Sequence, residues 1–343
     1  MTRIVHAIRS DGFAGVERFV AALATVQADN DDSVVVIGGN TDQMVRALAS
    51  RAEHCGAATV FGTVRGLRRQ ARQADIVNVH MTAAEVAATV ALSSRRPDRR
   101  PRVVATRHFA RGRGAGSGPA RDVVAWAGGQ RIDAEIAVSR WVAEHVAGPV
   151  HVVYPGVATR AVPAHEERER VVLVVQRLEP EKRTDAALEA FAGSGLIRHG
   201  WRLVIAGDGI QRRHLAQLSR RLSIDAATEW LGHRSDVIAV MDRAAIMLAP
   251  TPHEGLGLAV LEAMAGGLPV IAAGSGGHVE TVGAAPGGRL FRTTDEAVDL
   301  LRELAGDAGQ REEYGQALHA TQQRIFTMQR QYADTDAVYR SLL

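Results

Sequence analysis

Two glutamates, Glu254 and Glu262, stand eight residues apart around a glycine-containing loop. An apolar run ends at Pro250 and a helical pattern begins near Leu258, so the second carboxylate lies inside the predicted helix. A helix start offers unpaired N–H groups and a positive dipole end, which favour a phosphate. Carboxylates repel phosphate but accept hydrogen bonds from hydroxyls. Together these groups indicate a nucleotide or a sugar nucleotide; the alternative is a capped helix with two solvated glutamates.

Two cations could supply the charge that a diphosphate needs. Arg177 follows the apolar residues 171–175, a predicted buried strand, and so falls where open α/β sheets bind ligands. Lys182, the one lysine of the chain, lies at the start of the next predicted helix. A planar guanidinium and a compact ammonium could converge on one diphosphate, as a metal does elsewhere. The alternative is a pair of surface salt bridges.

Glycines mark two more turns from a predicted strand to a predicted helix. Gly12 and Gly15 follow the first strand, and Gly207-Asp208-Gly209 follows the strand at 201–206. Such turns allow close approach of ligand oxygens, although glycine is common in any turn of this kind. Gly12 and Gly15 do not complete the G-x-G-x-x-G fingerprint, which argues against a nicotinamide cofactor.

Strands that alternate with helices must position these residues. The length of 343 residues suggests two domains, and the turn at 154–157 with the polar stretch 163–170 predicts a linker between them. We predict strands at 4–8, 33–38, 75–79, 102–106, 134–138, 150–153, 171–175, 201–206, 245–249 and 269–272, and helices at 15–27, 42–51, 83–92, 141–147, 183–191, 210–222, 295–304 and through most of 311–343. The fold class is therefore α/β, with parallel sheets.

Composition excludes several classes of function. The net charge of +3 is small for this length and argues against nucleic acid as a partner. One cysteine, Cys55, permits no internal disulfide and fits a reducing compartment. No long apolar h-region follows the first residues, and no apolar run approaches the roughly 20 residues of a membrane span. We therefore expect neither a signal peptide nor a span, and a cytoplasmic location.

Arginines cluster twice in the first half of the chain, at Arg65, Arg68, Arg69 and Arg72 and at Arg95, Arg96, Arg99, Arg100 and Arg102. A solvated surface is the favoured interpretation, because the helix is not strongly apolar on its other face. Peripheral contact with an anionic membrane is the alternative. The glycine-rich residues 111–119 predict a loop that could act as a lid.

The motifs together resemble those of the retaining glycosyltransferases of family 4, which have the GT-B fold of two facing Rossmann-like domains. The resemblance covers almost the whole chain and is strong from residue 171 to residue 280. It rests on Arg177-Leu178 with Glu181-Lys182, Gly207-Asp208-Gly209, the E-x7-E signature of Glu254 and Glu262, Gly266-x-x-Pro269-Val270, Gly276-Gly277-x-x-Glu280, and, more thinly, Gly15-x-Glu17-Arg18, His108, Val138-Ser139 and Pro155-Gly156-Val157.

The resemblance implies a role for each candidate residue. Arg177 and Lys182 would hold the donor diphosphate, Glu254 would bind donor-sugar hydroxyls, and Glu262 the ribose hydroxyls. His108 would line the sugar site from the other domain, although a lone histidine after a strand is often structural. The backbone positions implied are Gly15 for a phosphate or the acceptor, Gly255, Leu256, Gly257 and Leu258 for the phosphate or sugar, and Leu231, Gly232 and His233 for the base; Gly12, Gly207 and Asp208 join them as turn residues of the binding site.

The same resemblance implies three segments. Residues 1–158 would bind the acceptor, 159–322 the nucleotide sugar, and 323–343 would form a helix that crosses back to the first domain. The reaction would move a sugar, with retention, from a nucleotide-diphospho-sugar to a hydroxyl of a glycan, glycolipid or small metabolite. No metal is assigned, because Asp29-x-Asp31 and Asp334-x-Asp336 lie in a turn and in the last helix. No cofactor other than the donor, of uridine or guanosine type, is expected.

Departures from the family pattern leave the substrates open. Gln176 stands where glycine is common, Leu256 where phenylalanine is frequent, and Met328 where tryptophan often occurs. Contacts at 176 and 256 would be made mainly by the backbone, so these changes bear on substrate identity more than on reaction class. The alternatives are another GT-B enzyme, such as a sugar-nucleotide epimerase or a phosphorylase, and a non-catalytic nucleotide-sugar-binding protein.

Overall fold

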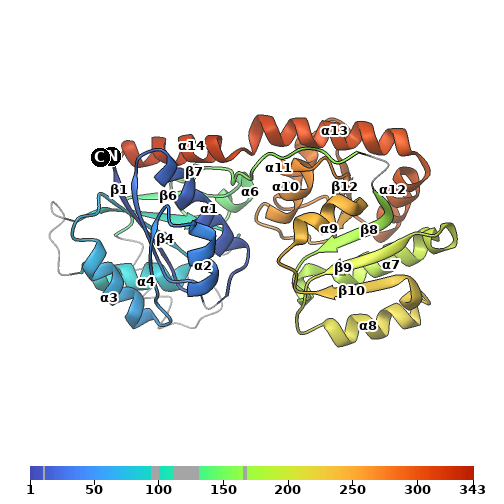
Figure 1. Ribbon diagram of the computed structural model, residues 1–343, viewed down its shortest axis with the longest axis horizontal. Helices are drawn as coiled ribbons and strands as arrows, with labels where there is room; N and C mark the ends of the chain where they lie inside the picture. Colours follow the sequence, from blue (N-terminus) through green and yellow to red (C-terminus); the bar gives the residue numbers. More distant parts are fainter. Residues whose placement is uncertain (11, 94–99, 111–130, 165–167) are drawn as a thin grey trace. The chain divides into compact units, whose positions relative to one another are not determined.

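In the computed structural model, the described residues are 1–10, 12–93, 100–110, 131–164 and 168–343, and they form two compact units (Figure 1). The first unit comprises Met1–Pro155 and Met328–Leu343, and the second comprises Gly156–Thr327. The glycine-rich residues 111–119 and the arginines at 95, 96 and 99 lie outside the described residues. In the described part of the chain, no helix is long and apolar enough to cross a membrane.

A parallel sheet forms the centre of the first unit. Its described strands follow the order β3-β2-β1-β4-β5-β6-β7. The strands before β4 are added toward one edge of the sheet and those from β4 on toward the other, so the strand order reverses between β1 and β4. In sheets of this type, ligands bind beyond the carboxyl ends of the strands near such a reversal. The strands are β1 (Arg3–Ile8), β2 (Ser33–Ile37), β3 (Glu53–Cys55), β4 (Ile76–His80), β5 (Arg102–Arg107), β6 (Ala134–Ala137) and β7 (His151–Val152).

Helices cover both faces of this sheet. On one face, α3 and α4 pack on Val5, Val77 and other apolar strand residues. On the opposite face, Val338 and Tyr339 of α14 pack on Ile4 and Ile76, and α14 lies along α1 (Figure 1). The described helices of the unit are α1 (Gly15–Asp29), α2 (Thr41–Leu48), α3 (Val60–Gln70), α4 (Thr82–Leu92), α6 (Arg140–Ala143) and α14 (Met328–Arg340).

The second unit repeats the plan with its own parallel sheet. Its described strands follow the order β10-β9-β8-β11-β12-β13, and the reversal lies between β8 and β11. The strands are β8 (Glu169–Val175), β9 (Arg202–Ala206), β10 (Thr228–Gly232), β11 (Ala244–Ala249), β12 (Val270–Ala273) and β13 (Arg289–Phe291). The helices are α7 (Thr184–Ser194), α8 (Arg212–Arg221), α9 (Val237–Arg243), α10 (Leu258–Ala265), α11 (His278–Thr281), α12 (Thr294–Gly306) and α13 (Ala308–Ile325).

Hydrogen bonds fix where the second unit begins and ends. The backbone N–H of Val157 donates to the carbonyl of Phe326 at 3.0 Å, and Nε2 of Gln322 donates to the carbonyl of Val157 at 3.1 Å. These bonds hold the segment after Pro155 against the end of α13, which continues to Ile325. The unit boundaries therefore fall at 155/156 and 327/328, whereas the sequence prediction placed them at 158/159 and 322/323.

Candidate functional site

The candidate residues of the second unit gather beyond the carboxyl ends of β8, β9, β10 and β11. Lys182 belongs to a short 3-10 helix, η3 (Pro180–Lys182), that follows β8. Glu254 lies in the loop between β11 and α10. Nζ of Lys182 donates to Oε2 of Glu254 at 2.5 Å, and both side chains are largely shielded, at 17% and 24% exposure. The ion pair thus joins the loops on both sides of the strand-order reversal.

Gln176 holds this pair of loops together. Its Nε2 donates to the carbonyl of Lys182 at 2.9 Å and to Oγ1 of Thr184 at 2.8 Å. Its Oε1 accepts from Oγ1 of Thr251, at the end of β11, at 2.9 Å. Mainly backbone contacts were expected at this position, so the role of the side chain was missed. The available signal was a polar residue directly after a buried apolar strand.

The loop that carries Glu254 is braced from behind by a second glycine turn. The N–H of Gly277 donates to the carbonyl of Glu254 at 2.8 Å. A Cβ on Gly276 would lie 2.8 Å from that carbonyl oxygen, and one on Gly277 would lie 2.5 Å from the carbonyl oxygen of Gly255. Only glycines permit this approach of two backbones. The turn therefore fixes the direction in which the side chain of Glu254 projects from the loop.

Gly257 begins α10 with a backbone that side chains rarely adopt, at φ +93°. No side chain caps this helix start. A Cβ on Gly257 would lie 3.3 Å from Nε2 of His278 and 3.4 Å from Cγ of Glu254. His278 is 1% exposed, and burial, with the charge of Lys182, lowers its pKa to about 4 against the opposing effect of Glu254. A neutral imidazole therefore lies behind the Lys182–Glu254 pair, and no sequence motif predicted it.

Arg177 and Glu262 are placed differently from this pair. Arg177 is exposed and forms an ion pair with Glu181 at 3.4 Å, with side-chain exposures of 58% and 50%. Such an exposed pair is weak and easily exchanged. Glu262 is half-buried within α10 among the buried residues Val260, Leu261, Ala263 and Met264. Gly255 and Leu256 of the preceding loop are buried, whereas Leu258 is half-buried at the start of the helix.

The glycines of the Gly207-Asp208-Gly209 turn are explained in part by contacts within the protein. A Cβ on Gly207 would lie 1.8 Å from the carbonyl oxygen of Gln176, and one on Gly209 would lie 2.5 Å from that of Leu178. The backbone N–H of Leu178 donates to the carbonyl of Asp208 at 2.9 Å. These glycines therefore let the ends of β8 and β9 touch. These contacts favour a structural role for this turn over a contact with the ligand.

The stretch predicted to meet a base ends strand β10. Leu231 and Gly232 are half-buried and His233 is exposed. A Cβ on Gly232 would meet nothing within 4 Å. Beside it, the guanidinium of Arg212 stacks on the ring of Trp230 at 4.1 Å from the ring centre. The end of β10 thus offers open space next to a flat, cation-backed aromatic surface.

The first unit presents its candidates beyond the carboxyl ends of β1 and β5. Gly12 is exposed, with nothing within 4 Å of a Cβ. Gly15 is the first residue of α1, whose start is fixed by Glu17, because Oε2 of Glu17 accepts from the N–H of Ala14 at 2.8 Å. His108 follows β5 and is partly exposed. Burial and the neighbouring Arg107 lower its pKa to about 3.

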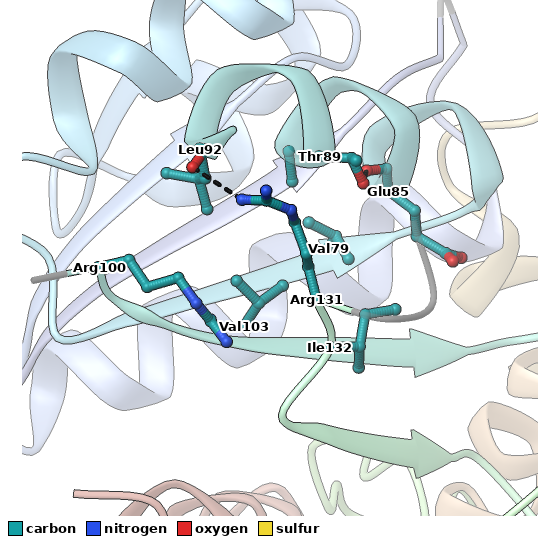
Figure 2. A pocket seen from close by; sticks show the side chains of 9 residues that line it. Val79, Glu85, Thr89, Leu92, Arg100, Val103, Arg131 and Ile132 are labelled. Atoms are coloured by element: carbon teal, nitrogen blue, oxygen red, sulfur yellow. Dashed lines mark hydrogen bonds between the residues drawn. The ribbon is translucent and has the colours of Figure 1, made fainter. Parts of the chain in front are cut away.

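Cavity volume does not locate the site. A cavity of about 10 Å³ lies between α4 and β5, beside Val79, Thr89 and Ile132 (Figure 2). Within it, Nη1 of Arg131 donates to the carbonyl of Leu92 at 3.1 Å. Such a space holds one water at most. A larger hollow of about 280 Å³, beside Ala245 and Pro269, lies at the amino ends of β11 and β12, away from the candidate residues.

The two arginine clusters have different surroundings. Arg65, Arg68 and Arg69 lie on α3, which also presents Phe61, 76% exposed. Arg100 instead forms a two-pronged ion pair with Asp133, at 2.7 and 2.9 Å, and Arg102 lies 3.7 Å from the same carboxylate. Part of the second cluster therefore serves to hold β5 to the segment before β6. For the first arginine cluster, a solvated surface remains the prediction.

Family models match both halves of the chain. A model described as glycosyl transferases group 1 matches residues 158–320, and one described as glycosyltransferase family 4 matches residues 13–161. A D-inositol 3-phosphate glycosyltransferase of Kribbella flavida is 33% identical over 194 residues, which cover 49% of this chain and 45% of that protein. A GDP-mannose-dependent phosphatidylinositol dimannoside mannosyltransferase of Mycobacterium tuberculosis is 30% identical over 154 residues, 45% and 39% of the two chains. The matches thus span less than half the length of these relatives.

Solved structures match over the full length. The Anabaena protein Alr3699/HepE in complex with UDP-glucose superposes with a TM-score of 0.82 at 18% identity, covering 99% of this chain and 100% of that one. The sucrose-phosphate synthase of Thermosynechococcus elongatus superposes with a TM-score of 0.78 at 16% identity, covering 100% and 99%. These neighbours show the GT-B fold of two Rossmann-like domains. Because the two family models together account for both of its halves, the chain belongs to the family 4 glycosyltransferases.

Proposed function

We propose that the protein transfers a sugar, with retention and without a metal, from a nucleotide-diphospho-sugar to an acceptor hydroxyl. The observation that carries this proposal is the Lys182–Glu254 pair beyond β8 and β11, beside the uncapped start of α10. A cation and free helix N–H groups suit a diphosphate, and a carboxylate beside them suits the hydroxyls of a sugar. The names of the relatives support the donor class, since one acts on GDP-mannose and a structural neighbour was solved with UDP-glucose.

Donor binding would exchange the partners of this pair. Lys182 would leave Glu254 for the diphosphate, joined by Arg177 from its weak surface pair and by the helix start of α10. Glu254 would then accept hydrogen bonds from sugar hydroxyls, and Glu262 from the ribose. Gln176 and the Gly276-Gly277 turn would keep the two loops in place during the exchange. The free energy lost when the Lys182–Glu254 ion pair breaks is thus partly regained through new charge-assisted hydrogen bonds to the donor.

The transfer step breaks the bond between the sugar's anomeric carbon and the phosphate oxygen. The electron pair passes to the diphosphate, whose developing charge is stabilised by Lys182, Arg177 and the N–H groups of α10. The acceptor oxygen bonds to the anomeric carbon from the same face, and its proton passes to a leaving phosphate oxygen. No protein nucleophile is required. Closure of an acceptor-binding first domain over the donor would exclude water.

The test measures release of nucleotide diphosphate from a panel of uridine and guanosine diphospho-sugars, each with and without candidate acceptors. Thermal unfolding of the same mixtures first identifies the donor, because a bound ligand raises the midpoint. Release that requires an acceptor, persists with a chelator and yields a product with the donor's anomeric configuration supports the proposal. Binding without release across the panel, or conversion of the donor without acceptor, would contradict it.

A further inference from the structure

His108 is the last of three histidines that hydrogen-bond in a row across neighbouring strands. Nδ1 of His6, on β1, lies 3.0 Å from Nε2 of His80, the last residue of β4. Nδ1 of His80 lies 3.1 Å from Nε2 of His108, just after β5. The ring centres are 5.3 Å apart at both steps. His6 and His80 are fully buried, whereas His108 is partly exposed.

A glutamine sets the direction of hydrogen bonding at the buried end. Oε1 of Gln27, on α1, lies 2.7 Å from Nε2 of His6. An amide oxygen can only accept a hydrogen bond, so His6 donates from Nε2.

The direction then passes along the row. A neutral imidazole has one donor and one acceptor nitrogen. A hydrogen on Nε2 of His6 leaves its Nδ1 to accept from Nε2 of His80, whose Nδ1 in turn accepts from Nε2 of His108. Burial keeps the row neutral: it lowers the pKa of His6 to about 4 and, with Arg107, that of His108 to about 3, and it lowers the pKa of His80 as well.

We propose that His6 and His80 are positioning residues that hold His108 in one tautomer, with hydrogen on Nε2 and a lone pair on Nδ1. This rests on the proposed function and on the role that the family resemblance implies for His108, which is a contact with the substrate. In the described part of the chain, both ring nitrogens of His6 and His80 have partners, but only Nε2 of His108 does. The lone pair of a neutral imidazole accepts a hydrogen bond from a hydroxyl, whereas an ionised phosphate has no hydrogen to donate to it. The substrate group opposite His108 is therefore a hydrogen-bond donor, such as a hydroxyl, and not an ionised phosphate.

The first test needs no substrate. Long-range ¹⁵N–¹H correlation spectra of the full chain with ¹⁵N-labelled histidine distinguish the two neutral tautomers of each ring. The expected result at pH 7 is hydrogen on Nε2 of His6, His80 and His108, with no change in a His54→Gln variant, because His54 bonds to the carbonyl of Gly38 outside the row. Hydrogen on Nδ1 of His108, or a charged ring, would overturn the proposal.

The second test changes the end of the row that lies away from the substrate. Gln27→Met removes the acceptor of His6 in a similar volume, so the row can reverse and place hydrogen on Nδ1 of His108. We expect this tautomer to appear in the spectra and kcat for transfer to fall about threefold to tenfold, with the donor KM within about twofold. If the Gln27→Met variant shows both tautomers of His108 while its kcat is unchanged, the proposed positioning role of His6 and His80 is wrong.

The two proposals fail in different ways. If the wild-type chain transfers no sugar, the proposed function fails although the wild-type spectra can still show the expected tautomer. If transfer occurs but His108 carries its hydrogen on Nδ1, only the inference about the row fails. Should Gln27→Met not fold, the wild-type spectra still decide the direction of the row.

Discussion

Nζ of Lys182 lies 2.5 Å from Oε2 of Glu254, although 72 residues separate them in the chain. Without ligand, the lysine charge is already neutralised by the carboxylate that is proposed to bind the donor sugar. The pair holds the two side chains against each other between the loops after β8 and β11. A donor that offers both phosphates and hydroxyls can replace both halves of the pair at once, whereas a bare phosphate can replace only one.

Replacing Lys182 should abolish most transfer while leaving the fold intact. Lys182→Ala removes the compact charge on the leaving diphosphate, so we expect kcat/KM to fall about hundredfold or more. Lys182→Arg should recover part of the loss. The measurement is nucleotide diphosphate release, beside thermal unfolding of each variant. Arg213→Ala, which removes an exposed cation on α8 of the same unit, is the matched control, and wild-type turnover by Lys182→Ala would refute the assignment.

Gln176 should matter for both stability and rate, although it need not touch the substrate. Gln176→Ala removes its hydrogen bonds to Lys182, Thr184 and Thr251. We expect the free energy of unfolding to fall by about 1–3 kcal/mol and kcat by roughly tenfold, because the turn that carries Lys182 loosens. Denaturant unfolding and steady-state kinetics measure the two effects. Gln316→Ala, on the exposed side of α13, should change neither, and a fully active Gln176→Ala would show that the turn holds its own shape.

Much of the fold followed from local patterns, and the exceptions have physical causes. The apolar run at 171–175 predicted the centre of β8 because a strand buried on both faces must be apolar throughout. Strand β10 was missed because it lies at a sheet edge and is only half-buried, so its residues show no apolar run. Helix α3 was assumed for the first arginine cluster but was given no bounds, and its sequence contains two glycines, which disfavour a helix on local propensity alone. Packing against α4 overrides that propensity.

The site was predictable only where each residue carries its signal locally. Lys182 and Glu254 were expected in one donor site but on different parts of the donor. Nothing in the sequence indicates that they form an ion pair, because the pair depends on the neighbouring order of β8 and β11. His6 and His80 looked like ordinary strand residues; their signal was an isolated histidine within an apolar strand, which must find a partner when buried. His278 became significant only because the Gly276-Gly277 turn carries it behind Glu254.

The Gly207-Asp208-Gly209 turn should prove essential for folding. A Cβ on Gly209 would lie 2.5 Å from the carbonyl oxygen of Leu178 and within 3 Å of that residue's backbone nitrogen. Gly209→Ala must push the ends of β8 and β9 apart, so we expect the free energy of unfolding to fall by more than about 2 kcal/mol. Gly306→Ala, where a Cβ meets nothing within 4 Å, should change it by less than about 1 kcal/mol. If Gly209→Ala were as stable as wild type but failed to bind donor, the glycine would serve the ligand instead.

Acid should destabilise the protein well before its carboxylates titrate. Burial lowers the folded-state pKa of His6 and His278 to about 4 and, with Arg107, that of His108 to about 3, from 6.5. The unfolded chain therefore binds more protons below pH 6.5, so the free energy of unfolding is highest above that value and falls as the pH drops toward 4. His6 alone accounts for on the order of 3 kcal/mol over the full range. Urea unfolding between pH 7.5 and pH 5 measures the slope. His6→Phe should reduce the slope, and a flat profile in the wild type would mean that these histidines are not held neutral in the folded state.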